Sequence, residues 1–332
     1  CPENELFCVP EQVRGHCGEA ADAGKELELQ WNSLFEDYRN SFPELARDFK
    51  DMQDRGLAAD WDADMPRFSP QDEKIATRKA SGMVINAISG KIPGLIGGSA
   101  DLAPSNKTVI DGTPDFQKAS PVGRNIRFGV REHSMGAILN GMILHHGLRP
   151  YGATFLVFAD YMRPAIRLAA LMKQPVIYIF THDSISVGED GPTHQPVEHL
   201  ASLRAFPNLT VIRPADANET VAAWRSAIMS SDSPVALILS RQKLPVIDRN
   251  RYAPAQELEK GAYILADTSR TPDLILIGTG SEVHICLEAS EKLAEQNIHA
   301  RVVSMPSWEL FDQMPKTYQD AVLPPSVTRR IA

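Results

Sequence analysis

Apolar positions follow two different patterns along this chain of 332 residues. In residues 1–69 they recur at helical spacing, and many of the positions between them are charged. From residue 70 onward, short apolar runs without alternation are separated by segments with helical spacing. Runs of this kind are typical of parallel strands that are buried on both faces. The pattern therefore predicts a helical arm over 1–69, followed by an α/β protein whose parallel sheet is covered by helices on both faces.

The arm is predicted to contain two helices that meet near Asn40. Ser41-Phe42-Pro43-Glu44 fits a capping box, with Ser41 as the cap and Pro43 in the first turn. Segment 58–66 is expected to be a connecting loop. We expect the arm to pack on another surface and not to carry chemistry, because its apolar positions form a helical stripe: Trp31, Leu34, Phe35, Tyr38, Phe42, Leu45, Phe49 and Met52.

The α/β part is predicted to contain two domains. The first covers 70–245, with strands at 94–98, 126–130, 151–155, 176–180, 210–212 and 235–239 and with helices at 75–87, from Glu132, at 158–172 and at 218–229. Residues 246–260 are polar and are expected to be a linker. Residues 261–332 resume with strands at 273–277 and 301–304, a helix at 283–295, and the start of a strand at Arg330. Two strands do not complete a doubly wound sheet, so we expect this last domain to be truncated.

Composition narrows the classes of function. The chain has 34 basic and 42 acidic residues, a net charge of −8, which argues against a nucleic-acid partner but leaves room for a local basic pocket. Its apolar runs, such as 175–180, are far shorter than the roughly 20 residues that span a bilayer. The first residues, without an initiator Met, suggest a cut within a longer protein.

The four cysteines are too few for a disulfide scaffold. Cys8, His16 and Cys17 are conceivable metal ligands, but a fourth partner is missing. Free thiols in a reducing cytoplasm are the better interpretation. Residues 278–281 (GTGS) mimic a dinucleotide-binding loop, yet the third glycine and the acidic residue at the next strand end are absent.

Polar clusters follow the expected strands at one edge of the sheet, where open α/β sheets bind ligands. Each cluster alone is explained by a helix cap or by solvated side chains. Together they supply two His, two Arg, two Asp, a Glu and a Ser, and Arg with His and Ser suits a phosphate group. The clusters cover 97–106, 129–133, 181–184, 188–195 and 239–242.

These clusters resemble the motifs of transketolase. The matching stretches are 98–106 (GSADLAPSN), 129–132 (GVRE), 181–196 (THDSISVGEDGPTHQP) and 237–242 (LILSRQ). The resemblance covers the whole chain but only the second half of the family, and it lacks the first domain, which carries the diphosphate and metal ligands. It implies that 70–245 is the pyrimidine-binding domain of a thiamine diphosphate-binding fold and that 261–332 is an incomplete C-terminal domain.

The resemblance also implies an activity. Transketolases transfer a two-carbon ketol unit from a ketose phosphate to an aldose phosphate in the pentose phosphate pathway, with thiamine diphosphate and a divalent metal, Mg²⁺ or Ca²⁺. Their cofactor lies between two subunits, so a homodimer or a complementary diphosphate-binding subunit is expected. A cytoplasmic location is expected, with no metal ligands on this chain. The chain alone should bind the cofactor poorly and should not catalyse ketol transfer.

For the cofactor, the resemblance assigns an acid and an aromatic pocket. Glu132 matches the glutamate that bonds the ring nitrogen of the aminopyrimidine, which makes it a catalytic candidate. Phe155, Phe158 and Tyr161 match the aromatic side chains around that ring. Asp101 resembles a position that touches the cofactor, although an Asx cap would explain it equally well.

For the substrate, the resemblance assigns phosphate donors, a hydroxyl reader and a proton carrier. Asp190 matches the residue that reads a substrate hydroxyl. His194 matches a histidine near the reacting carbons, a candidate for proton transfer at neutral pH. The donors that bind the substrate phosphate are matched by Arg78, Ser105, His182 and Arg241.

Two other interpretations stay open. One is a different thiamine diphosphate enzyme of the same domain order, either deoxyxylulose-phosphate synthase or the beta chain of a 2-oxoacid dehydrogenase. The other is a catalytically silent homologue or a regulatory partner. The phosphate donors and the long motif at 181–196 favour transketolase over the first. The presence together of Glu132, His182, Asp190 and Arg241 argues against the second.

Overall fold

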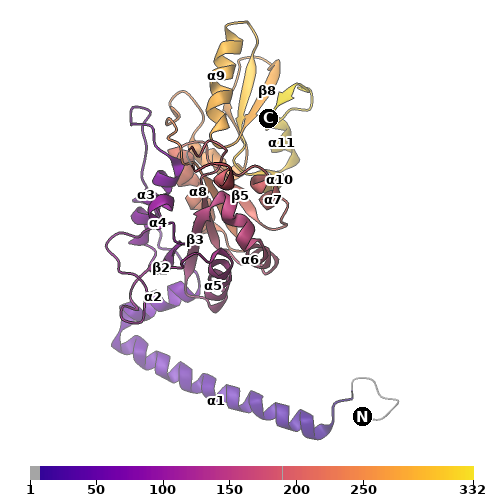
Figure 1. Cartoon of the computed structure of the whole chain (residues 1–332). Helices are drawn as coiled ribbons and strands as arrows, with labels where there is room; N and C mark the ends of the chain where they lie inside the picture. The colour runs from indigo at the N-terminus through magenta and orange to yellow at the C-terminus, as the bar shows by residue number, and fades with distance from the viewer. Residues whose placement is uncertain (1–7, 189) are drawn as a thin grey trace. The chain divides into compact units, whose positions relative to one another are not determined.

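The structure, a computed structural model, describes residues 8–188 and 190–332. The chain divides into two compact units, Cys1–Gly56 and Leu57–Ala332. Figure 1 traces the elements of both units along the chain. Among the helices of the described residues, none has the length and apolar content needed to cross a membrane.

The first unit contains the two helices that the sequence predicts, α1 (Glu11–Ser41) and α2 (Pro43–Gln53). The rings of Phe35 and Phe49 lie 5.8 Å apart between them. The predicted capping role of Ser41 is wrong. Phe42 occupies the cap position of α2, and Ser41 is still helical because the hydrogen bonds of α1 continue to Phe42 N. Pro43 is the first residue of α2, as predicted.

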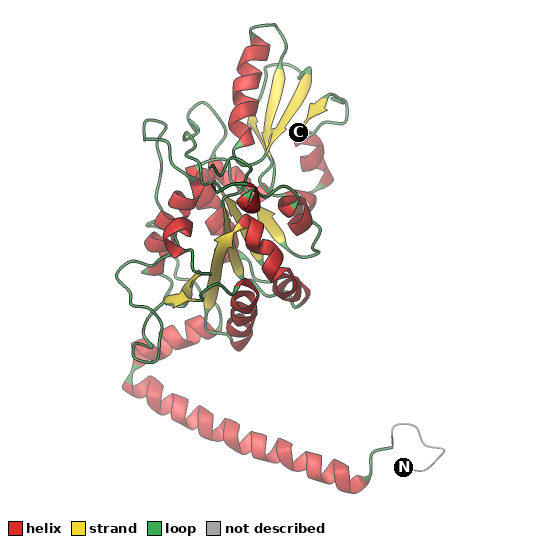
Figure 2. Ribbon diagram, viewed as in Figure 1, coloured by secondary structure: helices red, strands yellow, loops and turns green. Residues whose placement is uncertain are grey.

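The second unit is built on a six-stranded parallel sheet, so the predicted fold class is confirmed. Its helices lie on both sides of the strands (Figure 2). The strand order is β2 (Asn125–Arg127), β1 (Leu95–Ser99), β3 (Arg149–Phe155), β4 (Ile177–Thr181), β6 (Val235–Leu239) and β5 (Thr210–Ile212).

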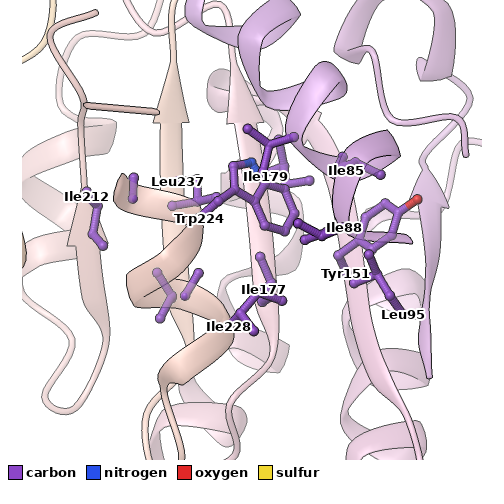
Figure 3. Close-up of a cluster of buried hydrophobic side chains, with 14 of the residues drawn as sticks. Ile85, Ile88, Leu95, Tyr151, Ile177, Ile179, Ile212, Trp224, Ile228 and Leu237 are labelled. Atoms are coloured by element: carbon purple, nitrogen blue, oxygen red, sulfur yellow. The ribbon is translucent and has the colours of Figure 1, made fainter. Parts of the chain in front are cut away.

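Strands β4, β5 and β6 supply apolar side chains to both faces of this sheet, which explains the absence of alternation in their sequences. On β4, Ile177 and Ile179 join the core beneath α3 (Thr77–Ser89) and α8 (Ala217–Met229). Figure 3 shows this core, in which Trp224 packs among isoleucines. The alternate residues Tyr178 and Phe180 join the opposite core, beneath α5 (Glu132–His145) and α6 (Ala159–Leu171).

Residues 57–69 belong to this second unit and not to the arm. Trp61 is only 6% exposed and is part of the core that contains Ile85 and Trp224. The segment has turns and no regular element, as expected for a connecting loop. Its single tryptophan anchors it, because burial of a large aromatic side chain outweighs the polar composition around it.

The C-terminal part has four strands where the sequence indicated two and the start of a third. The order is β10 (Arg330–Ile331), β8 (Leu274–Gly278), β9 (Ala300–Ser304) and β7 (Tyr263–Ala266), with β7 antiparallel to β9. Strand β7 was missed because it has only four residues and lies at an edge. The helices are α9 (Glu282–Ala294), α10 (Trp308–Asp312) and α11 (Lys316–Val322).

The expected linker at 246–260 is more closely packed than its polar composition suggests. It contains the short helix η3 (Ala255–Lys260), whose Leu258 is fully buried in the core of the first sheet. Arg249 in this segment donates to Tyr263 Oη at 2.9 Å and to Asp216 Oδ1 at 3.1 Å. The linker therefore joins the two sheets through a buried polar contact.

A second contact between the sheets lies in the loop at 278–281. Arg213 follows β5 and donates from Nη1 to the carbonyl oxygen of Thr279 at 2.9 Å and to the carboxylate of Glu282. Its Nε donates to Asp183 at 2.9 Å. Gly280 has a φ of +58°, and a side chain there would collide with Arg213. The loop that resembles a dinucleotide-binding turn is thus filled by this guanidinium.

Candidate functional site

The strand register brings the predicted clusters to one edge of the sheet. Phe155 at the end of β3 is level with Thr181 at the end of β4, which is level with Leu239 at the end of β6. The residues that follow these strands therefore leave the sheet side by side. They include His182 and Arg241, two of the predicted phosphate donors.

Two buried hydroxyl residues join the start of α3 to the end of β6. Thr77 N donates to Ser240 Oγ at 3.1 Å, and Ser240 N donates to Thr77 Oγ1 at 2.7 Å. Arg78 and Arg241 are the next residues in each segment. The reciprocal bonds therefore place the two guanidinium groups at the same edge, through a contact that the sequence alone did not indicate.

Arg78 connects two other predicted donors. Its Nη1 donates to the backbone carbonyl of Ser105 at 2.7 Å and lies 3.4 Å from Nε2 of His182. Burial, followed by the charge of Arg241, lowers the pKa of the Arg78 guanidinium. A bound anion would relieve this crowding of positive charge. Arg78 and Arg241, together with Ser105 and His182, form a cationic cluster, which we call the cationic pocket.

His182 is the most enclosed member of this pocket. It is 3% exposed, and its backbone has a φ of +60°. Its ring lies 3.7 Å from that of Phe155, centroid to centroid. Burial, followed by the charge of Arg78, lowers the pKa of His182 from 6.5 to about 4. The imidazole is therefore neutral at pH 7.

Asp190 and Arg241 close one side of the pocket. Arg241 Nε lies 3.9 Å from Asp190 Oδ2. Asp190 also acts on His182: its negative charge favours the protonated ring and so opposes the lowering of the His182 pKa. Burial and the charge of Arg78 have the larger effect, so the pKa stays low. Gly188, two residues before Asp190, has a φ of +87°, a backbone conformation that favours glycine.

The predicted aromatic residues form a continuous wall beside the pocket. Phe155 and Phe158 are stacked, with centroids 5.8 Å apart, and the ring of Tyr161 lies 6.0 Å from that of Phe158. His194, in the short helix η2 (Pro192–His194), meets Phe158 edge-on at 5.3 Å. Tyr161 is 65% exposed, so the outer end of the wall is open to solvent.

Glu132 is the first residue of α5 and is 8% exposed. Within 8–188 and 190–332, its carboxylate has no hydrogen-bond or ion-pair partner. The N-terminus of the helix stabilises this charge. Glu132 is not among the described residues with a fully buried, unpartnered polar atom, so its carboxylate oxygens remain accessible from the site. The group is thus suited to accept a hydrogen bond from a ligand.

Asp101 is exposed and has a φ of +60°. The short helix α4 (Ala103–Asn106) has Leu102 at its cap position and no side-chain cap, so an Asx cap does not explain Asp101. In the part of the chain that the structure describes, Asp101 and Glu132 form no hydrogen bond or ion pair with the other predicted site residues.

One group of metal-type side chains comes together among the described residues: Asp160, Glu198 and His199. The two carboxylates face opposite ring nitrogens, at 3.1 Å from Nε2 for Asp160 and 3.9 Å from Nδ1 for Glu198. One ligand atom from each of the three residues lies within 4.8 Å of the other two, a spacing that exposed acidic groups often show without an ion. Cys8, His16 and Cys17 form no such group.

Sequence reasoning missed the residues beneath the site. Thr77 and Ser240 position the arginines, while Asn106 and Thr181 lie behind His182. Thr181 and Ser240 stand directly before a predicted donor, at the point where an apolar strand becomes polar. A hydroxyl residue at the end of an apolar strand was therefore the only sequence signal for these residues. It does not show which hydroxyl groups meet across the sheet.

The fold and this edge together define a class: an α/β protein with a cationic pocket beside an aromatic wall. The chain matches the transketolase pyrimidine-binding domain over residues 73–246 and the transketolase-like C-terminal domain over 261–332. It therefore belongs to the transketolase family, and the resemblance seen in the sequence is confirmed.

Individual relatives agree with this assignment. Transketolase of Geobacillus stearothermophilus is 52% identical over 99% of this chain and 49% of its own length. A Pichia stipitis transketolase variant, solved in complex with xylulose-5-phosphate, matches 97% of this chain and 48% of its own, with a TM-score of 0.92 and 44% identity. A split-gene transketolase, described as an inactive β4 tetramer, matches 71% of this chain and 73% of its own, with a TM-score of 0.58 and 31% identity. The chain spans about half the length of the curated relatives that it matches.

Proposed function

We propose that this chain forms the pyrimidine- and substrate-binding half of a transketolase, which transfers a two-carbon ketol unit between sugar phosphates of the pentose phosphate pathway. The observation that supports this most strongly is the contact of Arg78 with His182, 3.4 Å apart, in a pocket shared with Arg241. A cationic pocket of this kind suits a phosphate group better than any uncharged ligand. The Pichia stipitis relative was solved with such a sugar phosphate.

In this proposal the pocket binds the phosphate end of the substrate. Arg78 and Arg241 supply charge-assisted hydrogen bonds, and Ser105 and His182 complete the pocket. Asp190 lies beside Arg241 and accepts a hydrogen bond from a substrate hydroxyl. A group that bonds a substrate hydroxyl discriminates against analogues that lack it. His194, edge-on to the aromatic wall, carries a proton near the reacting carbons.

The residues present fit the pyrimidine ring of thiamine diphosphate. The accessible carboxylate of Glu132, which has no donor among the described residues, suits a protonated ring nitrogen. Phe155, Phe158 and Tyr161 offer faces on which an aromatic ring stacks. When bound, the cofactor supplies a stabilised carbanion for ketol transfer. Glu132 holds a proton at that ring nitrogen, the aromatic wall excludes water, and Asp101 lies at the rim. We assign the diphosphate and its Mg²⁺ or Ca²⁺ to a complementary domain.

The partner is proposed to cover the exposed face of α5 and α6. Ile138 on α5 and Tyr161, Leu168 and Leu171 on α6 are between 47% and 65% exposed. An apolar patch on two adjacent helices is typical of an interaction surface. The partner is either a second copy of the family's full-length chain or a separate diphosphate-binding subunit, an arrangement that the split-gene relative illustrates. We place the complex in the cytoplasm.

The proposal is tested by complementation. The chain is co-expressed with the first half of the Geobacillus stearothermophilus transketolase, and ketol transfer from xylulose 5-phosphate to ribose 5-phosphate is measured with thiamine diphosphate and Mg²⁺. We expect activity only when both parts and the cofactor are present. A matched control carries Glu132→Gln in this chain, which should assemble but not turn over. A stable complex without ketol transfer would contradict the proposal.

A further inference from the structure

We infer that Asn106 is a positioning residue that sets the tautomer of His182, so that Nδ1 carries the ring proton and Nε2 presents a lone pair to the pocket. What this tautomer implies for substrate binding rests on the proposed function, in which His182 is a phosphate ligand. The tautomer itself is a property of this chain and is testable without any activity.

The first step concerns Arg78. A guanidinium group has only N–H donors and no acceptor. Its Nη1 lies 3.4 Å from Nε2 of His182, so a favourable contact requires a lone pair on Nε2. The ring is neutral at pH 7, because burial and Arg78 lower the pKa of His182 to about 4. A neutral imidazole has one N–H, which must then be on Nδ1.

The second step concerns Thr181 and reaches the same result independently. Nδ1 of His182 lies 2.8 Å from Thr181 Oγ1, whose own proton is donated to Asn106 Oδ1 at 2.6 Å. A hydroxyl has a single proton. Because Thr181 donates that proton to Asn106, its oxygen must accept a hydrogen bond from Nδ1–H of His182.

The orientation of the Asn106 amide therefore acts together with Arg78 to decide where the imidazole proton lies. Asn106 is fully buried at the end of α4, and its Nδ2 donates to Ser99 Oγ at 3.2 Å, which in turn lies 2.7 Å from Thr108 Oγ1. If the amide were reversed, the Thr181 hydroxyl would donate to Nδ1. The proton would then move to Nε2 and face the N–H of Arg78, donor against donor.

This arrangement has a consequence for the ligand. Ser105 and Asn106 are neighbours, so one short turn holds Arg78 through a backbone carbonyl and sets His182 through a side chain. An Nε2 lone pair accepts a hydrogen bond from an O–H group, such as that of a phosphate ester in its singly ionised form. A fully ionised phosphate needs a proton on Nε2 before it forms a hydrogen bond there.

The tautomer is measured by NMR on the full 332-residue chain with ¹⁵N-labelled histidine rings. The signals of His182 are identified by their loss in His182→Gln. We expect Nδ1 at a protonated, pyrrole-type shift and Nε2 at an unprotonated, pyridine-type shift. Asn106→Leu removes the acceptor for Thr181, while Arg78 still favours a lone pair on Nε2. The Nδ1–H preference should therefore weaken, and both shift types should be populated at each nitrogen. Thr181→Val should also weaken the Nδ1–H preference, while Thr181→Ser should keep it.

Asn140→Leu is the matched control, because Asn140 is another buried asparagine of the same domain and bonds Ala165 O instead. It should leave the His182 tautomer unchanged. Wild-type signals that place the proton on Nε2 overturn the inference, as does an unchanged tautomer in folded Asn106→Leu. Circular dichroism establishes folding, and Thr181→Val decides the matter if Asn106→Leu does not fold. None of these outcomes depends on ketol transfer.

Discussion

Thr77 and Ser240 are 163 residues apart in the sequence, yet each donates its backbone N–H to the hydroxyl of the other. Both residues are buried, so neither backbone group has water as an alternative partner. The pair joins α3 to the last strand of the sheet that leads into the pocket. It explains how Arg78 and Arg241, distant along the chain, reach one pocket.

Thr77→Val tests this connection. It removes a buried acceptor and leaves Ser240 N without its partner, which typically costs about 1–3 kcal/mol. We expect the free energy of unfolding, measured with urea, to fall by this amount. Thr154→Val is the control, because the buried Thr154 hydroxyl has no hydrogen-bond partner among the described residues and its loss should be neutral or stabilising. Equal losses in both variants would refute the role of the pair.

Arg241→Ala tests the phosphate pocket in the complemented enzyme. Loss of a charge-assisted hydrogen bond costs about 1.5–3 kcal/mol, so KM for phosphorylated acceptors should rise roughly 10- to 100-fold. KM for unphosphorylated aldehydes should stay near its original value. Arg270→Ala, on the C-terminal domain, serves as the control. An equal rise for both acceptor types would exclude a phosphate contact.

Glu132→Ala tests the cofactor assignment in the same enzyme. Removal of a group that holds a proton in the reaction lowers turnover by about 10²- to 10⁴-fold. The fall should appear in kcat at saturating cofactor, measured by ketol transfer. Glu198→Ala changes an exposed glutamate at the start of α7 (His199–Arg204) and should leave kcat unchanged. A Glu132→Ala enzyme of normal kcat is incompatible with the assigned role.

His182 should make folding stability depend on pH. Its pKa is about 4 in the folded chain, lowered from 6.5 by burial first and then by Arg78. Between these values the unfolded chain binds a proton that the folded chain does not, so this contribution to stability is lost as pH falls from about 6.5 to about 4. The other charged groups facing the ring are Asp190, Arg241 and His194.

The measurement is urea unfolding of wild type and His182→Gln at pH 7.5 and pH 5. The variant should lose less stability between the two pH values, because it has no proton to exclude at this position. The difference between the two losses isolates His182 from the acidic groups common to both chains. Parallel losses would show that the imidazole does not titrate in this way.

Arg213→Met should cause the two sheets to unfold in separate transitions. The substitution leaves the buried Asp183 carboxylate without its partner, and breaking a buried pair on one side costs about 3–5 kcal/mol. We expect lower stability and two unfolding transitions in place of one. Arg251→Met, which breaks an exposed pair with Glu291, should cost little. A single transition of wild-type midpoint would refute the role of Arg213.

Local patterns were sufficient for most of the fold. The apolar runs at 210–212 and 235–239 coincide with β5 and β6, because both strands are covered by helices and are apolar on both faces. Strand β7 escaped notice, since four residues at an edge carry too little periodicity. Ser41 was misread as a cap because the capping pattern does not show where the preceding helix stops.

The sequence by itself determined the α/β architecture, the edge at which the polar clusters gather and the family to which they belong. Only the tertiary structure decided how those clusters combine. Arg78 reaches His182, Thr77 meets Ser240, and Asn106 lies behind Thr181. No local sequence pattern connects Thr77 with Ser240 or Asn106 with Thr181. The physical reason is that hydrophobic periodicity reports burial along one element, whereas hydrogen bonds between buried polar groups depend on which elements the packed sheet brings together.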